Sequence, residues 1–210
     1  MSAVDLAAAH EERASVRKGT DAEVPRMAGV LARAFYDDPA FTWVLHGDPK
    51  RMGIMRKGFE LFLERVWMEQ QHTYTTRSVA GVAAWELPGQ WKLGAGRQLR
   101  LLPAMLRVFA RHSPRVLRAI ATIEASHPRE PHHYLAFIGV DPEWQGRGLG
   151  AALLEAVLER CDGERMPAFL EASRPRNRDL YERHGFAVTE EFRLGRGAPP
   201  QWRMWREPRA

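Results

Sequence analysis

The sequence predicts a single domain of mixed α/β class, with a β-sheet flanked by helices, over residues 1–210. Short runs of β-forming residues alternate with segments whose apolar residues recur at helical spacing. In the clearest case, the apolar run 134–140 leads through a glycine-rich loop into a helical pattern that begins at Leu149. Hydrophobic residues make up 45% of the chain, and no repeat or linker divides it. A chain of this size can bury one proper core, so we expect one domain.

The first third of the chain predicts a flexible end, a strand and two helices. The opening residues are small and polar, so we expect them to fray. Thr20 is a suitable N-cap for the first helix, whose apolar residues recur at helical spacing up to Phe35. Pro39 separates the two helices, because the residue before a proline disfavours helical geometry. The predicted elements are a flexible end at 1–12, a strand at 15–18, and helices at 20–35 and 50–68.

The middle of the chain predicts a hairpin and a helical segment. The β-rich runs 72–76 and 79–87 are separated by two residues, a spacing typical of a hairpin. The segment 90–128 then has apolar residues at helical spacing and predicts two helices divided near Pro114. This segment has the character of an insertion, and its residues suggest no chemistry of their own.

The last part of the chain predicts a strand, a short helix and a final hairpin. The run 167–173 is apolar and suits a strand. A short helix begins near Asn177 and stops at Gly185, a natural residue for the position just past a helix end. The runs 187–194 and 201–206 then alternate in the manner of half-buried strands and predict a hairpin.

The loop between the central strand and its helix has glycine at three alternate positions, Gly146, Gly148 and Gly150. Glycine allows a positive φ and leaves no Cβ between the backbone and a ligand. The first amides of the following helix have no intrahelical acceptor and lie at the positive end of the helix dipole. Together with the charge of Arg147, these groups predict a site for a phosphate or a pyrophosphate.

Two common phosphate-binding loops do not fit this stretch. A Walker loop needs a lysine followed by serine or threonine, and no lysine occurs here. A dinucleotide fingerprint needs the spacing Gly-x-Gly-x-x-Gly, which the glycines do not have. The pattern that is present is Gln-x-x-Gly-x-Gly, formed by Gln145, Gly148 and Gly150.

This pattern resembles the acetyl-CoA pyrophosphate loop of the GNAT superfamily of N-acetyltransferases. A second match lies about one strand further on. There, Asn177, Tyr181, Gly185 and Phe186 follow the Asn-x-x-x-Tyr-Glu-x-x-Gly-Phe signature of the same superfamily. Two motifs in the right order are far more specific than either alone. The residues of the second motif are most similar to those of the puromycin N-acetyltransferase branch. The resemblance extends over about residues 128–205.

The resemblance implies the GNAT fold, in which a central, largely antiparallel and splayed sheet is flanked by helices. It implies an enzyme that moves an acetyl group from acetyl-CoA to the primary amine of a small, antibiotic-like molecule, by direct transfer in a ternary complex. Two alternatives stay open. The chain is then either a non-catalytic module that binds acyl-CoA in a regulatory role, or an acetyltransferase that acts on a protein or peptide amine.

The resemblance also implies an acetyl-CoA site. Backbone groups of the central strand bind the pantetheine arm where this strand splays from its neighbour, and the Val140 N–H polarises the carbonyl. Loop amides take the pyrophosphate, and Asn177 bonds to the pantetheine arm or orients its helix. The implied cofactor-binding residues are Ile138, Gly139, Val140, Gln145, Gly146, Arg147, Gly148, Leu149, Gly150, Ala151 and Asn177.

Acetyl transfer requires a neutral amine and a proton for the departing thiolate. The resemblance places Tyr181 beside the sulfur as the general acid, the alternative being a tyrosine that only packs between helix and sheet. Glu171 lies on the strand beside the splay and is the candidate general base, the alternative being a solvated side chain. Both residues are therefore named as catalytic candidates.

The acceptor amine is expected near the first two helices, as the resemblance implies. Aromatic and acidic side chains there can hold a cationic amine, although core aromatics and solvated acids are the alternative. The helical segment 90–128 either lines the acceptor site or forms the face of a homodimer. The candidate substrate residues are Phe35, Asp37, Asp38, Glu124 and His133, the last two also being further candidates for the base.

Composition argues against several other classes of protein. A formal charge of +5 and a pI near 9.8 can indicate nucleic-acid binding, but the arginines are scattered, so we expect no nucleic-acid partner. A modest positive field instead helps to attract polyanionic CoA. The single Cys161 excludes an internal disulfide, and no apolar run reaches membrane-spanning length, so a cytoplasmic protein is expected. The histidines lack metal-ligand spacing, so we expect no metal.

Overall fold

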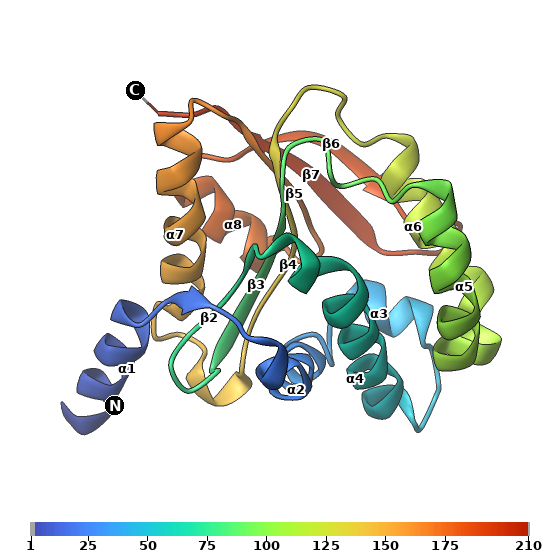
Figure 1. Cartoon of the computed structure of the whole chain (residues 1–210), viewed down its shortest axis with the longest axis horizontal. Helices are drawn as coiled ribbons and strands as arrows, with labels where there is room; N and C mark the ends of the chain where they lie inside the picture. The colour runs from blue at the N-terminus through green and yellow to red at the C-terminus, as the bar shows by residue number, and fades with distance from the viewer. Residues whose placement is uncertain (1–2, 210) are drawn as a thin grey trace.

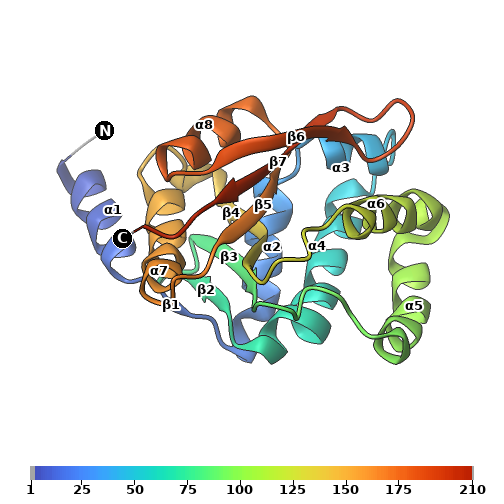
Figure 2. The same ribbon diagram turned by 90° about the horizontal axis from the view of Figure 1, so that it is seen from above.

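The computed structural model describes residues 3–209 and places one seven-stranded sheet among them, with helices on both faces (Figure 1, Figure 2). The strands are β1 (Arg17–Lys18), β2 (Thr73–Thr75), β3 (Gly81–Glu86), β4 (His133–Val140), β5 (Ala168–Ala172), β6 (Ala187–Arg193) and β7 (Pro200–Arg206). Their order is β1-β2-β3-β4-β5-β7-β6, and each neighbouring pair is antiparallel except β4 and β5, which are parallel. The predicted mixed α/β fold with a largely antiparallel sheet is confirmed.

The helices are α1 (Ala3–Ala14), α2 (Val24–Ala34), α3 (Pro39–Val44), α4 (Arg51–Phe62), α5 (Ala95–Phe109), α6 (Ser113–Ala125), α7 (Leu149–Gly163) and α8 (Pro175–Arg183). On one face of the sheet, Leu153 of α7 packs in a buried cluster with Leu135 of β4. On the other face, Leu31 of α2 packs in a second cluster with Val82 of β3. The α5–α6 pair stands at the end of the molecule that is opposite α1 and α7 (Figure 1, Figure 2). The sheet thus separates two cores.

Several predicted elements are present with shifted ends. The first predicted helix consists of the 3₁₀ turn η1 (Asp21–Glu23) and α2, and Thr20 caps η1 in a capping box with Glu23. The helix predicted for 50–68 begins as α4 and continues through the π-helical turn η2 (Leu63–Trp67) and the 3₁₀ turn η3 (Met68–Gln70). The two helices predicted in 90–128 are α5 and α6, joined by the 3₁₀ turn η4 (Ala110–His112).

The expected flexible end at 1–12 is replaced by helix α1 in the described part, whereas residues 1 and 2 lie outside the described residues. The segment is rich in alanine, the residue with the highest helix propensity. Two side chains near the end of α1 also attach it to the domain. The buried carboxylate of Glu12 accepts a hydrogen bond from the Ser78 amide at 3.3 Å, and Arg13 Nη1 donates to the carbonyl oxygen of Arg147 at 3.1 Å.

The parallel pair β4 and β5 separates part of the way along its length. Residues 133–135 pair with residues 168–170, and β4 then continues to Val140 without β5 as a partner. On the other side of β4, Ala84 pairs with Phe137 but Trp85 pairs with Leu135, which leaves Ala136 as an extra residue. Such a bulge bends a strand and turns its side chains. The predicted splay of the sheet is therefore present, and it begins at Ala136.

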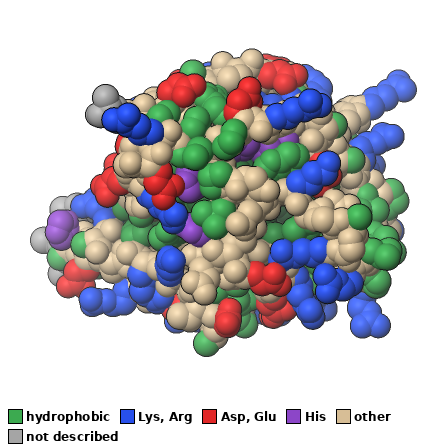
Figure 3. All heavy atoms as spheres, turned by 45° about the horizontal axis from the view of Figure 1, so that its top comes forward, with side chains coloured by type: hydrophobic (Ala, Val, Ile, Leu, Met, Phe, Trp, Pro, Cys, Tyr) green, Lys and Arg blue, Asp and Glu red, His purple; other side chains and the backbone are tan. Residues whose placement is uncertain are grey.

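Charged side chains of both signs are spread over the surface. On the face shown in Figure 3, lysine and arginine side chains lie at several separate places with acidic side chains between them. Within residues 3–209, no helix is both long and apolar enough to cross a membrane.

Candidate active site

The glycine-rich loop holds the start of α7 open to a ligand. Gly146 and Gly148 have φ angles of +76° and +82°, a region that favours glycine. Gly148 is the N-cap of α7, and the first intrahelical bond runs from the Ala152 amide to the Gly148 carbonyl at 3.1 Å. The amides of residues 149–151 therefore have no acceptor within the helix. They form the positive end of a helix of 15 residues, as a phosphate site requires.

Side chains around this loop fix its position. The η5 turn (Pro142–Trp144) precedes it, and the guanidinium of Arg147 lies over the Trp144 ring, 5.0 Å from the centroid. Gln145 Nε2 donates to the carbonyl oxygen of Val140 at 3.0 Å, which ties the loop to the end of β4. Gln145 thus stabilises the loop through its side chain, and Arg147 remains half-exposed beside the free amides.

The backbone of β4 presents polar groups to the gap between β4 and β5. The Asp141 amide donates to the Ala80 carbonyl at 2.9 Å and thus points toward β3. Successive residues of an antiparallel strand alternate in direction, so Gly139 also points toward β3. The N–H and C=O groups of Val140 and Ile138 point the other way, into the gap. Since the Val140 carbonyl already accepts from Gln145, the Val140 N–H and both groups of Ile138 are left for a ligand.

Gly139 does not belong with these two residues. Its backbone groups are directed to β3, and its Cα faces α2, where an added Cβ would lie 2.9 Å from the Cβ of Ala34. Glycine at this position lets α2 pack closely against β4. Gly139 was predicted to bind the cofactor, and the structure instead gives it a packing role.

Helix α8 brings the second motif to the other side of the gap. Asn177 and Tyr181 are one turn apart, so they lie on the same face, and both line a cavity that extends from the gap. Tyr181 is 5% exposed, and burial, together with the nearby Asp38 carboxylate, raises the pKa of its phenol above the ordinary value. The phenol therefore stays protonated at neutral pH and is able to donate a proton.

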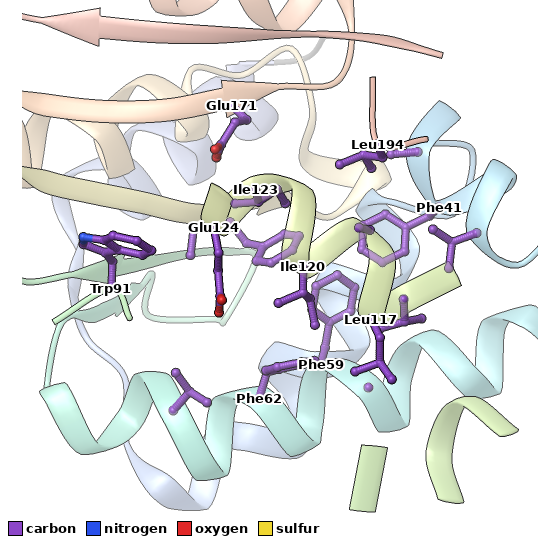
Figure 4. A pocket seen from close by; sticks show the side chains of 18 of the residues that line it. Phe41, Phe59, Phe62, Trp91, Leu117, Ile120, Ile123, Glu124, Glu171 and Leu194 are labelled. Atoms are coloured by element: carbon purple, nitrogen blue, oxygen red, sulfur yellow. The ribbon is translucent and has the colours of Figure 1, made fainter. Parts of the chain in front are cut away.

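The cavity has a volume of about 680 Å³ and lies between the sheet, α4 and the α5–α6 pair. The rings of Phe35, Phe41, Phe59 and Phe137 pack in one cluster at its wall, with centroids 5.3–6.1 Å apart. Figure 4 shows apolar side chains of α4 and α6 facing one another, with the carboxylates of Glu124 and Glu171 among them. Side chains of the helical segment 90–128 line this cavity.

Glu171 lies on β5 and lines the cavity from the sheet. Tyr134 Oη donates to its Oε2 at 2.8 Å, and its buried Oε1 has no partner among the described residues. Burial raises the pKa of Glu171 to about 7, and the hydrogen bond from Tyr134 limits that rise. A carboxyl group that titrates near neutral pH is suited to accept a proton from an amine.

Glu86, at the end of β3, is a second buried carboxyl group at the cavity, and the sequence analysis missed it. Trp67 Nε1 donates to Glu86 Oε1 at 3.0 Å, whereas Oε2 has no partner among the described residues. Burial raises the pKa of Glu86 to about 8. The available signal was an acid at the end of an otherwise apolar strand, next to Leu87 and Trp85.

Tyr134 is the other residue that sequence reasoning missed. It stands opposite Glu86 in the strand register and donates to Glu171. His127 packs edge-on against it, with ring centroids 4.7 Å apart, and Trp91 stacks on His127 at 3.8 Å. A tyrosine in a buried strand carries no pattern that distinguishes it from a core residue.

Of the predicted acceptor residues, Phe35, Asp38 and Glu124 line the cavity. Asp38 is already engaged, because its carboxylate accepts the Ala40 and Phe41 amides and the Ser173 hydroxyl. It caps α3 and joins it to the end of β5.

Two predicted acceptor residues do not reach the cavity. The side chain of Asp37 is 85% exposed and forms an ion pair with Arg51 at 3.7 Å. The backbone turns between Asp37 and Asp38, so the two neighbouring side chains point in different directions. His133 is fully buried, and its Nε2 contacts Glu164 Oε2 at 3.0 Å beyond the end of α7. Its position next to Tyr134 on a strand directs it to the opposite face of the sheet.

Among residues 3–209 no group of three or more His, Cys, Asp or Glu side chains is placed to hold a metal ion. Cys161 is buried in the α7 core, where burial raises the pKa of its thiol to about 12. A thiol in this environment is a packing residue and not a nucleophile.

Comparison with known proteins adds three findings. The sequence model of the acetyltransferase (GNAT) family matches residues 63–186. An uncharacterized N-acetyltransferase of Schizosaccharomyces pombe is 27% identical over 192 residues, covering 81% of this chain and 73% of that protein.

Two solved structures have a similar fold. The structure of histone acetyltransferase HPA2 and related acetyltransferase from Corynebacterium glutamicum has a TM-score of 0.71 at 25% identity, and the match covers 93% of this chain and 97% of that chain. An N-acetyltransferase of Staphylococcus aureus Mu50 has a TM-score of 0.62 at 15% identity, covering 90% and 98%.

Proposed function

Because this chain belongs to the acetyltransferase (GNAT) family, we propose that it moves the acetyl group of acetyl-CoA to the primary amine of a small molecule, by direct transfer in a ternary complex. One observation carries the proposal. The gap between β4 and β5 meets the glycine-rich loop at one end and opens at the other into the apolar cavity. A thioester held along the gap would thus have its carbonyl where the cavity begins. The more specific likeness to puromycin N-acetyltransferases stays a prediction from the motif wording.

The residues around the gap fit acetyl-CoA. The free amides of residues 149–151, with Arg147 beside them, would bind the pyrophosphate. The backbone groups of Ile138 and the Val140 N–H would bind the pantetheine arm and polarise the carbonyl, and Asn177 would contact the arm from α8. Of these residues, Ile138 and Asn177 line the same cavity as Tyr181.

The chemical step uses Glu171 and Tyr181. The acceptor nitrogen attacks the carbonyl carbon, so that a C–N bond forms and the C–S bond breaks. Glu171 takes the proton that the amine loses, directly or through a water molecule, and the Tyr181 phenol donates a proton to the departing thiolate. No covalent enzyme intermediate is needed, because both substrates are held in line.

The cavity, with its volume of about 680 Å³ and its largely apolar walls, has the size and character of a small-molecule site, which supports a small-molecule acceptor over a protein or peptide amine. A non-catalytic acyl-CoA-binding module is the other alternative. The cavity placement of both Tyr181 and Glu171 favours turnover over that alternative, since a module that only binds needs neither side chain there.

The test is release of the CoA thiol from acetyl-CoA with a panel of puromycin, arylalkylamines, polyamines, aminoglycosides and short peptides. We expect turnover with small amines and a higher melting temperature with acetyl-CoA alone. Turnover with peptides only would assign a protein acceptor. Stabilisation by acetyl-CoA without any turnover would favour the binding module, and no stabilisation would overturn the loop assignment.

A further inference from the structure

The floor of the cavity carries one polar side chain on each of three adjacent strands. Glu86 of β3 stands opposite Tyr134 of β4 in the strand register, so the two lie on the same face of the sheet. Tyr134 reaches across to Glu171 of β5 through its hydrogen bond at 2.8 Å. All three side chains line the cavity.

Two carboxylate oxygens of this row are buried without a partner among the described residues, Glu86 Oε2 and Glu171 Oε1. Glu86 is only 6% exposed, and its other oxygen is occupied by Trp67. Buried polar groups are almost always hydrogen-bonded, and unpaired ones are costly. The two free oxygens therefore call for a ligand with several N–H donors, and a primary ammonium has three.

Among the charged residue types, the cavity lining contains only acids. The lining contains the acids Asp38, Glu86, Glu124 and Glu171. None of the lysine and arginine residues that the structure describes lines the cavity. Arg203 lies opposite Glu171 in the β5–β7 register, but its guanidinium is paired with Glu190 and sits 3.9 Å from the centroid of the Phe192 ring. An anionic group on the acceptor would thus meet carboxyl groups and no basic side chain in the lining.

The remaining walls are apolar. The cluster of phenylalanine rings stands on the α2–α4 side, and aliphatic side chains of α5 and α6, such as Met105 and Ile120, stand across from it. A polyamine or an aminoglycoside would leave most of its polar groups unpaired here. An aromatic or branched aliphatic group would bury its surface.

We infer that Glu86 and Glu171 together bind the amine of a lipophilic acceptor, a primary amine with a bulky aromatic or branched apolar body and no anionic group. The inference rests on the proposed function and names its substrate class. Glu86 is the residue that sets this specificity. The bound ammonium first releases one proton to solvent, which leaves the neutral amine, and Glu171 then takes the proton that the nitrogen loses as the C–N bond forms. The raised pKa values of both carboxyl groups agree with a site that is completed by a cation.

The first test uses the wild-type protein and matched acceptors. Phenylethylamine and tryptamine carry the cation alone, phenylalanine and tryptophan add a carboxylate to the same body, and spermidine adds charge without an apolar body. We expect kcat/KM for the arylalkylamines to exceed that for the matched amino acids and for spermidine by about tenfold or more, the factor that about 1.4 kcal/mol gives. Higher kcat/KM for amino acids, polyamines or peptides would overturn the inference and leave acetyl transfer intact.

The second test uses Glu86→Gln, which keeps an oxygen acceptor for Trp67 and cannot become a carboxylate when a cation binds. The KM of this variant for phenylethylamine should rise about tenfold or more, because a hydrogen bond to a charged group is lost. Its KM for acetyl-CoA should not change. Glu64→Gln, on the exposed side of η2, is the matched control and should change neither constant. An unchanged acceptor KM in Glu86→Gln would mean that Glu86 only holds Trp67, and the inference would be wrong.

A binding measurement separates this inference from the proposed reaction. Phenylethylamine is titrated calorimetrically into wild-type protein saturated with CoA, and then into Glu86→Gln. Heat of binding that disappears in the variant supports the amine site even when no acceptor is acetylated, in which case only the reaction is wrong. Absence of both binding and turnover with every lipophilic amine overturns the site.

Discussion

At the scale of single residues, the site depends on side chains whose protonation is set by burial. Tyr181 keeps its proton because burial and the Asp38 carboxylate oppose the phenolate. Glu171 and Glu86 hold their protons up to about pH 7 and pH 8 for the same reason. A weak acid, together with a base whose pKa lies near neutral pH, is what acetyl transfer to an amine requires.

Tyr181→Phe removes the proposed proton donor and keeps the ring that packs beside Phe186. We expect kcat to fall by about a hundredfold, within the range for general acids, while the acetyl-CoA KM changes much less. Steady-state kinetics with both substrates varied gives the two constants. A variant with the wild-type kcat would rule out this role for Tyr181.

Glu171 can accept a proton only when it is ionised, and its pKa lies near 7. With an acceptor of fixed ionisation over the range, kcat should rise with pH up to about 7 and then level off. In Glu171→Gln this rise should disappear, and kcat should be lower by about a hundredfold. A pH profile that is the same in both proteins would assign the base elsewhere.

Glu86 makes stability depend on pH. Its pKa is about 8 in the folded protein, where burial dominates, and close to 4.5 in the unfolded chain. The folded state therefore binds the proton more tightly, and the stabilisation present below about pH 4.5 is lost as the pH rises through about 8. At about 1.4 kcal/mol per pKa unit, the free energy of unfolding should fall by a few kcal/mol.

Urea unfolding of the ligand-free protein between about pH 5 and about pH 9 measures this loss. Glu86→Gln should show a flatter profile, because glutamine does not titrate. Glu64→Gln should keep the wild-type slope. A Glu86→Gln profile as steep as that of the wild type would show that other groups cause the pH dependence.

At the scale of elements, the loop and helix α7 act together. Gly148 has a φ of +82°, and an added Cβ would also lie 3.1 Å from the Cδ atom of Arg13 in α1. Helix α1 therefore packs directly on the predicted phosphate loop, and its last turn restricts which residue can stand at the α7 N-cap. The close approach depends on glycine at this position.

Gly148→Ala should destabilise the protein by about 1–2 kcal/mol, the cost of left-handed backbone for a residue with a Cβ. The melting temperature should fall by a few degrees, and the acetyl-CoA KM should rise because the free amides move. Gly150→Ala is the control for stability, since Gly150 has no positive φ and its Cβ would meet Leu180 at an ordinary 3.7 Å. Equal melting temperatures for both variants would contradict the backbone explanation.

At the scale of the whole molecule, the two substrates would meet different electrostatic environments. The chain carries a net charge of +5, with Arg147 next to the loop amides. The cavity beyond the gap is lined by acids and apolar groups. A positive molecule attracts polyanionic CoA, whereas the cavity favours a cation.

Added NaCl should therefore raise the acetyl-CoA KM severalfold, because salt screens the exposed charges that attract CoA. The KM of a lipophilic amine should change less, since its carboxylate partners are buried and less screened. Initial rates over a salt series, with the second substrate saturating, measure both constants. Equal salt dependence of the two would contradict the separation of these environments.

The loop and the α8 motif were predictable because their chemistry is local. Glycine at three alternate positions indicates the backbone geometry at the start of α7. The spacing of Asn177 and Tyr181 indicates that both side chains lie on one face of α8. The strand–loop–helix order and the two hairpins follow from periodicity alone. Helix α1 was missed because its alanine-rich segment has little amphipathic pattern, and because its own side chains hold it to backbone groups of distant segments.

The proposed acceptor site depends on the tertiary structure. Glu86, Tyr134 and Glu171 come from strands far apart in the sequence, and only the strand register sets them in one row. Adjacent acids such as Asp37 and Asp38 have opposite environments, since one turn of backbone decides which side chain faces the interior. The sequence by itself determined the fold class and the loop, because dihedral preferences and periodicity act over a few residues. Which carboxyl groups are buried together, and hence their pKa values, was decided by packing between elements, which no local pattern contains.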